Sequence, residues 1–263
     1  EILSGLVGSE MCIRDRVPII QHPDVRRMLM TMKALTAAAR AICYSCAFAI
    51  DMSHAEDGAE ATRWADRASL LTPMAKSFST DIGVEVASIG IQVHGGMGFI
   101  EETGAARLLR DARIAPIYEG TNGIQAMDLV MRKLPLAGGE AVDALLAEIE
   151  ADIDAVETAN RPGIAPMAEG LREALDDLRD ATAFLRQAGV DDALAGATAY
   201  QRLFSLVLGG SLMARAALRA EEGTGHDALA RFMVADILPE TGGLKRKVKA
   251  TGRALESVDA ALA

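Results

Sequence analysis

Residues 25–46, which read VRRMLMTMKALTAAARAICYSC, decide the fold class. Apolar side chains recur in this stretch at every third or fourth position, which is the period of one face of an α-helix. Pro23, just before the stretch, is a residue that the first turn of a helix accepts. We therefore predict a helix from residue 23 to about residue 52. Its apolar face consists of Val25, Met28, Leu29, Met32, Leu35, Ala39, Ile42 and Cys46.

The same period returns further along the chain. A second apolar stripe over residues 64–89 predicts another long helix, and Gly95 with Gly96 follows it as a stop signal. Two shorter helices are predicted over residues 103–113 and 122–134.

Pro135 and the pair Gly138-Gly139 mark the strongest candidate domain boundary. Beyond it we predict amphipathic helices over residues 142–156, 169–187, 191–222, 226–238 and 244–261. No stretch has the alternating period of a β-strand. The predicted fold class is all-α, with a four-helix up-down bundle over residues 17–137 and a second, smaller helical domain over residues 138–263.

Residues 1–16, EILSGLVGSEMCIRDR, have neither a helical nor a strand period. The piece SGLVGSEMCIRDR resembles translated sequencing-adapter sequence, so we expect residues 1–16 to be a non-native leader. The alternative is a genuine, flexible terminus. In either case we expect the reading frame to begin inside a longer gene, because the helical pattern from Val17 starts in the middle of a fold.

The composition excludes several classes of protein. The chain has 263 residues, 50% hydrophobic and 4% aromatic, and a formal net charge of −10. Few aromatic residues favour helix over strand, and the acidic balance argues against a nucleic-acid-binding surface. No apolar run approaches the roughly 18 residues of a membrane span, and no secretory signal is visible. Cys43 and Cys46 lack the second pair that a zinc site needs, so we expect a cytoplasmic protein without a metal.

Two short segments depart from the bundle pattern, and both place glycine beside polar groups. They are QVHGGMGF at residues 92–99 and IYEGTNGIQ at residues 117–125. At the first, the two glycines either stop a helix or let a ligand approach the backbone, where free N–H groups can cradle a phosphate. At the second, Glu119 precedes a helix that Thr121 is suited to cap. Glu119 is either a solvated turn residue or a general base.

The stretch QVHGGMGFIEETGAARLLRDARIAPIYEGTNGIQ, residues 92–125, strongly resembles the acyl-CoA dehydrogenase family, and the likeness is close over residues 17–134. The spacing from the Gly-Gly turn through RDA at residues 110–112 to EGT at residues 119–121 carries it. Residues from about 138 onward resemble the extra helical domain of a large-chain subgroup, mainly through YQRLFSLVLGGSLMARAAL.

The resemblance implies roles for individual residues. Glu119 matches the catalytic base, and Gly120 leaves room for the thioester substrate beside it. The family's turn that holds the FAD of a neighbouring subunit matches Gln92, Val93, His94, Gly95 and Gly96. Thr121 and Asn122 match contacts to the flavin side of the site. Gly123 stands where many members have a glutamine that binds FAD, which puts that contact in doubt.

The function that the resemblance implies is FAD-dependent α,β-dehydrogenation of an acyl-CoA thioester, with this chain as the C-terminal part that carries the base. It also implies a homo-oligomer and an electron-transfer acceptor. We expect the flavin-covering domains to be absent from the chain and the fragment to be inactive alone. Two alternatives remain open: a non-catalytic helical assembly module, and an acyl-CoA oxidase, which shares the base but passes electrons to oxygen.

Overall fold

The computed structural model describes residues 18–255 and 258–262, so the predicted leader at residues 1–16 lies outside the described residues. The described parts are helical and contain no strand, which confirms the all-α prediction. The main helices are α2 (Pro23–Ala55), α3 (Gly58–Val93), α4 (Gly96–Phe99), α5 (Ala105–Ala112), α6 (Asn122–Asp128), α7 (Glu140–Glu157), α8 (Met167–Leu185), α9 (Val190–Arg219), α10 (Gly225–Phe232), α11 (Glu240–Leu255) and α12 (Val258–Leu262). Two π-helical turns, η3 (Leu129–Lys133) and η5 (Met233–Ile237), extend α6 and α10.

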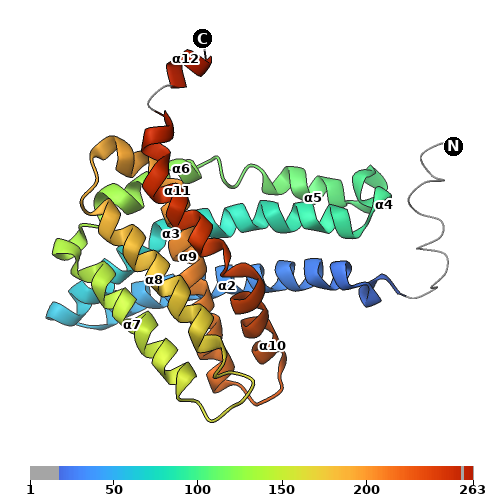
Figure 1. The fold of residues 1–263 in the computed structure, drawn as a ribbon, viewed down its shortest axis with the longest axis horizontal. Coiled ribbons are helices and arrows are strands. Elements are labelled where there is room, and N and C mark those ends of the chain that lie inside the picture. The colour runs from blue at the N-terminus through green and yellow to red at the C-terminus, as the bar shows by residue number, and fades with distance from the viewer. Residues whose placement is uncertain (1–17, 256–257, 263) are drawn as a thin grey trace.

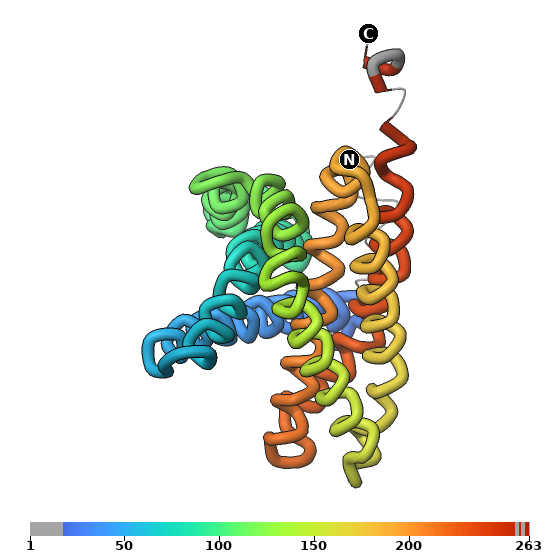
Figure 2. Tube along the Cα trace, turned by 90° about the vertical axis from the view of Figure 1, so that its left-hand side faces the viewer, coloured from blue at the N-terminus to red at the C-terminus, as the bar shows by residue number. Residues whose placement is uncertain are grey.

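Helices α2 and α3 form a long hairpin that runs across the other helices (Figure 1). Pro23 lies in the first turn of α2, as the sequence predicts. The second half of α3, the first half of α2, α4 and α5 extend together to one side, and we call this part the arm. Helices α7, α8, α9 and α11 make up the body, and the hairpin crosses them at a large angle in the second view (Figure 2).

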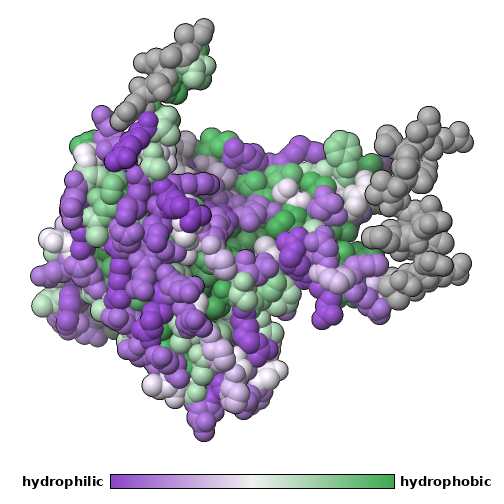
Figure 3. All heavy atoms as spheres, viewed as in Figure 1, coloured by the Kyte–Doolittle hydropathy of each residue, from purple (hydrophilic) through white to green (hydrophobic). Residues whose placement is uncertain are grey.

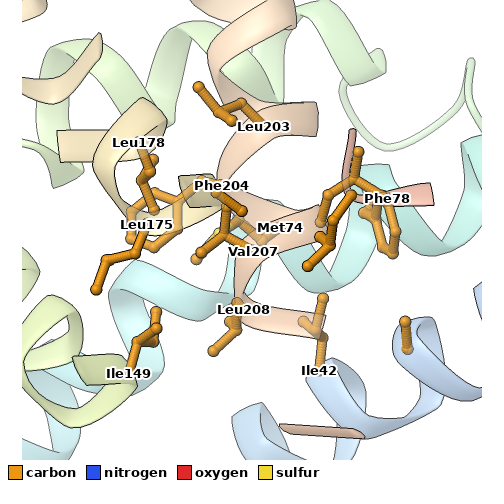
Figure 4. Packing of buried hydrophobic residues seen from close by; sticks show 14 of the residues in the cluster. Ile42, Met74, Phe78, Ile149, Leu175, Leu178, Leu203, Phe204, Val207 and Leu208 are labelled. Atoms are coloured by element: carbon orange, nitrogen blue, oxygen red, sulfur yellow. The ribbon is translucent and has the colours of Figure 1, made fainter. Parts of the chain in front are cut away.

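Helix α9 lies at the centre of the fold and contacts α2, α3, α6, α7, α8, α10 and α11. Its buried side chains include Leu203, Phe204, Val207 and Leu208, which meet residues of α2, α3, α7 and α8 in one apolar cluster (Figure 4). At Gly209 helix α9 packs tightly against α2, because a Cβ atom there would lie 2.8 Å from the Cβ of Ala38. The parts before and after residue 137 therefore share one core, while the division into two domains at that point stays a prediction.

A half-buried polar network also joins α3, α7 and α9. Arg67 of α3 binds Glu148 of α7, and Arg215 of α9 binds both Glu148 and Asp152 at 2.6 Å. Ser211 adds a 2.6 Å hydrogen bond to Asp152. Burial would raise the pKa of Glu148, but the hydrogen bonds and charges of the two guanidinium groups outweigh it and hold that pKa below its usual value.

Helix α2 is long and apolar enough, by length and composition alone, to cross a membrane. The core helix of a protein without any membrane passes the same test. Its buried residues, among them Leu35, Ala38 and Ile42, belong to the shared core and α2 packs along α3 and α9. This packing buries 33% of the most apolar window of α2.

Candidate active site at the turn before helix α6

The turn between α5 and α6 is closed by backbone hydrogen bonds. The Ile117 N–H donates to the Ile114 carbonyl at 2.9 Å, and the Asn122 N–H donates to the Pro116 carbonyl at 3.0 Å. Inside this turn Glu119 has φ 53° and Gly120 has φ 81°, so two successive residues are left-handed. Glycine adopts that conformation freely, whereas a residue with a Cβ loses about 1–2 kcal/mol. A glutamate stays there only because its surroundings hold it.

Glu119 is exposed, and neither its carboxylate nor its N–H has a hydrogen-bond partner in the described part of the chain. Thr121 is the N-cap of α6, as the sequence predicts, and its Oγ1 accepts a 3.3 Å hydrogen bond from the Ile124 N–H. The cap fixes where α6 starts. The turn therefore presents a free carboxylate and a free backbone donor on one residue.

Polar side chains in the middle of α3 form hydrogen bonds to the turn. Lys76 Nζ donates to the Gly120 carbonyl at 2.9 Å and to Asn122 Oδ1 at 2.7 Å. Asn122 Nδ2 in turn lies within hydrogen-bond distance of Thr80 Oγ1 at 2.9 Å and Asp81 Oδ1 at 2.7 Å. Lys76, Thr80 and Asp81 could not be singled out from the sequence, because a polar stripe on a helix normally indicates a solvated face.

Exposed apolar side chains surround the turn. Ile114, Ile117 and Tyr118 precede Glu119 and Ile124 follows it, and all four are exposed in the single chain. Apolar surface is visible along the arm in the space-filling view (Figure 3). Contiguous apolar surface on a folded protein usually marks a contact site, so this side of the turn is suited to a partner or ligand.

The second candidate segment lies at the end of α3. Gln92 and Val93 form its last turn, and His94 Nδ1 donates a 2.7 Å hydrogen bond to the Gly90 carbonyl. Gly95 has φ 60°, which suits glycine, and both Gly95 and Gly96 are exposed.

A third glycine of this segment, Gly98, was missed at the level of sequence. It is buried, and a Cβ atom there would lie 2.3 Å from the Ile91 carbonyl oxygen. Gly98 therefore lets α4 fold back onto the end of α3. The only sequence signal for it is the third glycine in GGMG.

The two candidate segments are not brought together within one chain. Glu119 lies beside Lys76 in the middle of α3, and His94 lies 18 residues further along the same helix. At 1.5 Å per residue this corresponds to about 27 Å. Figure 1 likewise shows α4 at the outer end of the arm and α6 at its base. The two segments therefore lie at opposite ends of the arm.

Glu101 and Glu102 are exposed residues of a 3₁₀ turn at the outer end of the arm (η2, Glu101–Thr103). The hydrogen bond and charge of Arg110, with an Nη1 to Oε1 distance of 2.8 Å, lower the pKa of Glu101. Neither carboxylate is near the turn that carries Glu119.

Comparison with known protein families gives two adjoining matches. Residues 13–134 match the family described as "Acyl-CoA dehydrogenase, C-terminal domain", and residues 145–259 match "Acetyl-CoA dehydrogenase C-terminal like". The chain is 42% identical to 3-methylmercaptopropionyl-CoA dehydrogenase of Ruegeria pomeroyi over 85% of its own length and 38% of the relative's. It is 33% identical to a butyryl-CoA dehydrogenase of Syntrophomonas wolfei over 89% of its length and 41% of the relative's.

Two solved structures share the fold. Caenorhabditis elegans ACDH-11, in complex with C11-CoA, superposes with a TM-score of 0.67 and 22% identity over 80% of this chain and 36% of that one. Bacillus anthracis acyl-CoA dehydrogenase, complexed with FAD, gives a TM-score of 0.57 and 17% identity over 91% and 43%.

The chain spans about two fifths of the length of the curated relatives it matches, 38% and 41%. The two family matches together run through both the hairpin and the body. The chain belongs to the acyl-CoA dehydrogenase family, whose C-terminal domains it carries.

Proposed function

We propose that this chain supplies the catalytic base, Glu119, for the FAD-dependent α,β-dehydrogenation of an acyl-CoA thioester. The single observation that carries the proposal is the exposed Glu119 carboxylate, held on a closed, left-handed turn with no partner in the described residues. The names of the relatives support the reaction class. A base must keep its carboxylate free and fixed, and this turn meets both needs.

Two groups of Glu119 would act on the substrate. Its free backbone N–H can donate to the thioester oxygen, where negative charge develops as the neighbouring α-carbon loses a proton. Its carboxylate would accept that proton. Removing one such backbone donor typically costs about 3 kcal/mol in the barrier. Gly120, which carries no side chain, leaves the approach to these atoms open.

FAD, when bound, accepts the hydride from the β-carbon of the substrate. The proposed residues for holding it fit that role. The exposed turn formed by Gln92, Val93, His94, Gly95 and Gly96 presents open backbone, and a Cβ atom at either glycine would meet nothing within 4 Å. Thr121 uses its hydroxyl oxygen as a cap and keeps the hydroxyl proton for a further acceptor.

Three further parts of the proposal concern the whole protein. The distance of about 27 Å along α3 between the two segments supports a homo-oligomer in which one subunit's turn serves its neighbour. An electron-transfer acceptor would reoxidise the flavin, in contrast to an oxidase, which uses oxygen. The free thiols of Cys43 and Cys46 are compatible with the cytoplasm as the location.

The test is Glu119→Gln in the full-length parent protein. Glutamine keeps the size and the backbone N–H but cannot take up the α-proton. Flavin reduction by acyl-CoA in the absence of oxygen is measured as bleaching of the visible absorbance. We expect its rate to fall by about 10⁴-fold or more in the variant, with FAD still bound. The control Glu102→Gln changes an exposed glutamate of η2 and should bleach at the parent rate. A bleaching rate of the Glu119 variant within about tenfold of the parent rate would be a smaller effect than loss of a general base usually gives. That result would mean that another carboxylate is the base.

A further inference from the structure

Asn122 has its polar groups occupied from within the chain. Its side-chain oxygen accepts from Lys76 at 2.7 Å and lies 3.2 Å from Thr80 Oγ1, whose single proton has a nearer acceptor in the Lys76 carbonyl at 2.9 Å. Its amide nitrogen has three acceptors within reach, namely the Ser77 carbonyl at 3.1 Å, Thr80 Oγ1 and Asp81 Oδ1. Two amide protons face three acceptors, so neither proton lacks an acceptor within the chain.

The backbone of Asn122 is equally occupied on the donor side, because its N–H closes the turn onto the Pro116 carbonyl. Asn122 is half-buried against α3, as Lys76 and Thr80 are. Neither the amide protons of its side chain nor its backbone N–H are therefore available to a cofactor.

Lys76 joins the two halves of the turn. One ammonium group binds the carbonyl of Gly120, directly after Glu119, and also the side chain of Asn122 at the start of α6. Bonds from a charged donor are about twice as strong as neutral ones. The lysine therefore fixes the orientation of the peptide between Gly120 and Thr121, which begins one residue after the left-handed glutamate.

We propose that Lys76 and Asn122 are positioning residues that hold Glu119 in its left-handed conformation, and that Asn122 does not contact the flavin. The inference rests on the proposed role of Glu119 as the base. It differs from the contact that the family resemblance implies for Asn122. Lys76 acts through the turn and does not itself touch the substrate.

The first test measures backbone hydrogen exchange in the 263-residue chain and needs neither cofactor nor substrate. Lys76→Met should speed exchange of the Asn122 amide by about tenfold, which corresponds to the loss of one charge-assisted hydrogen bond. Lys133→Met is the matched control. Lys133 is also largely buried and ties η3 to α3 through a 2.8 Å bond to Ser69, but it does not contact the turn. The control should leave the Asn122 amide unchanged.

The second test measures turnover in the full-length parent. Lys76→Met should lower kcat by about 10²-fold, the usual result of misplacing a reacting group by about 1 Å, with KM and FAD content unchanged. Lys76→Arg keeps a charged donor and should restore part of the rate. Thr80→Val preserves shape and the lysine charge, so it gives a milder loss of kcat even if the lysine variant does not fold. Asn122→Ala should lose kcat and keep its FAD.

The outcomes separate the two proposals. An active Glu119→Gln variant would overturn the proposed base, whatever the lysine variants do. An inactive Glu119→Gln variant beside a Lys76→Met variant with parental kcat and parental amide exchange would overturn the positioning role alone. Equal losses in Lys133→Met would do the same, since they would indicate general docking of the helices. Loss of FAD from Asn122→Ala, with normal turnover per bound flavin, would restore the flavin contact.

Discussion

Gly209→Ala should destabilise the protein, although the same exchange in a helix normally stabilises it. Alanine is better than glycine inside a helix by about 1 kcal/mol. At Gly209 the new Cβ would lie 2.8 Å from the Cβ of Ala38, against an optimal carbon separation of about 3.5–4.0 Å. Overpacking of this kind costs about 1–3 kcal/mol. We expect a net loss of about 1 kcal/mol of unfolding free energy, which corresponds to a fall in Tm of about 2–4 °C.

Two further variants make the sign of the effect decisive. Gly83→Ala changes a glycine inside α3 whose Cβ would meet nothing within 4 Å, so it should stabilise by about 1 kcal/mol. Ala38→Gly removes the methyl group that Gly209→Ala would strike. The double variant should therefore regain near-parental stability, giving a coupling energy of about 1–3 kcal/mol in a double-mutant cycle.

Urea denaturation of the 263-residue chain, followed by circular dichroism, gives all four free energies. A Gly209→Ala variant as stable as Gly83→Ala, or a double variant whose effects simply add, would refute the reasoning. Either result would mean that α9 does not pack directly onto α2 and that the two parts of the chain do not share one core. The experiment therefore tests the direct packing of α9 against α2.

Three other predictions follow from the site and the core. Glu148→Gln should destabilise the chain at neutral pH by about 1–2 kcal/mol, discounted because the ion pairs with Arg67 and Arg215 are partly exposed. The pKa of Glu148 is lower in the folded state than its unfolded value near 4.5, so the ionised carboxylate stabilises the fold above that pH. This stabilisation is lost as the pH falls through the folded-state pKa. The unfolding free energies of parent and variant, measured by urea titration, should therefore converge in acid. Purified residues 1–263 should be colourless and inactive after dialysis, and stoichiometric bound flavin would contradict that expectation. In the parent protein, Glu119→Gln should stay yellow but fail to bleach with acyl-CoA.

Helix positions could be predicted well from apolar period, and their ends less well. The predicted helix over residues 64–93 runs through Pro73, and α3 does the same. The predicted helix over residues 122–134 is instead α6 followed by the π-helical turn η3. A π turn of five residues is too short for apolar periodicity to distinguish it from an α-helix. The shared core could not be foreseen either, because α9 has apolar residues on every side and the pattern does not say which neighbours cover them.

Some residues of the candidate site could likewise be predicted from the sequence and others could not. Glu119, Gly120 and Thr121 were predicted from a contiguous motif, and Thr121 caps α6 as expected. Lys76 and Asp81 lie some 40 residues earlier on α3 and meet the motif only because the chain folds back through the arm. A single sequence contains no signal for such a long-range pairing of polar groups. The conformation of Glu119 was also beyond prediction, since a left-handed glutamate depends on those distant contacts.

Because Glu119 has a left-handed backbone, its proposed catalytic role and thermal stability favour different residues at this position. Glycine at this position would relieve about 1–2 kcal/mol of backbone strain and remove the only carboxylate on the turn. With Glu119 as the proposed base, a library of variants sorted by heat resistance alone would enrich substitutions that remove it. Stabilising changes are better sought at exposed helical glycines such as Gly83.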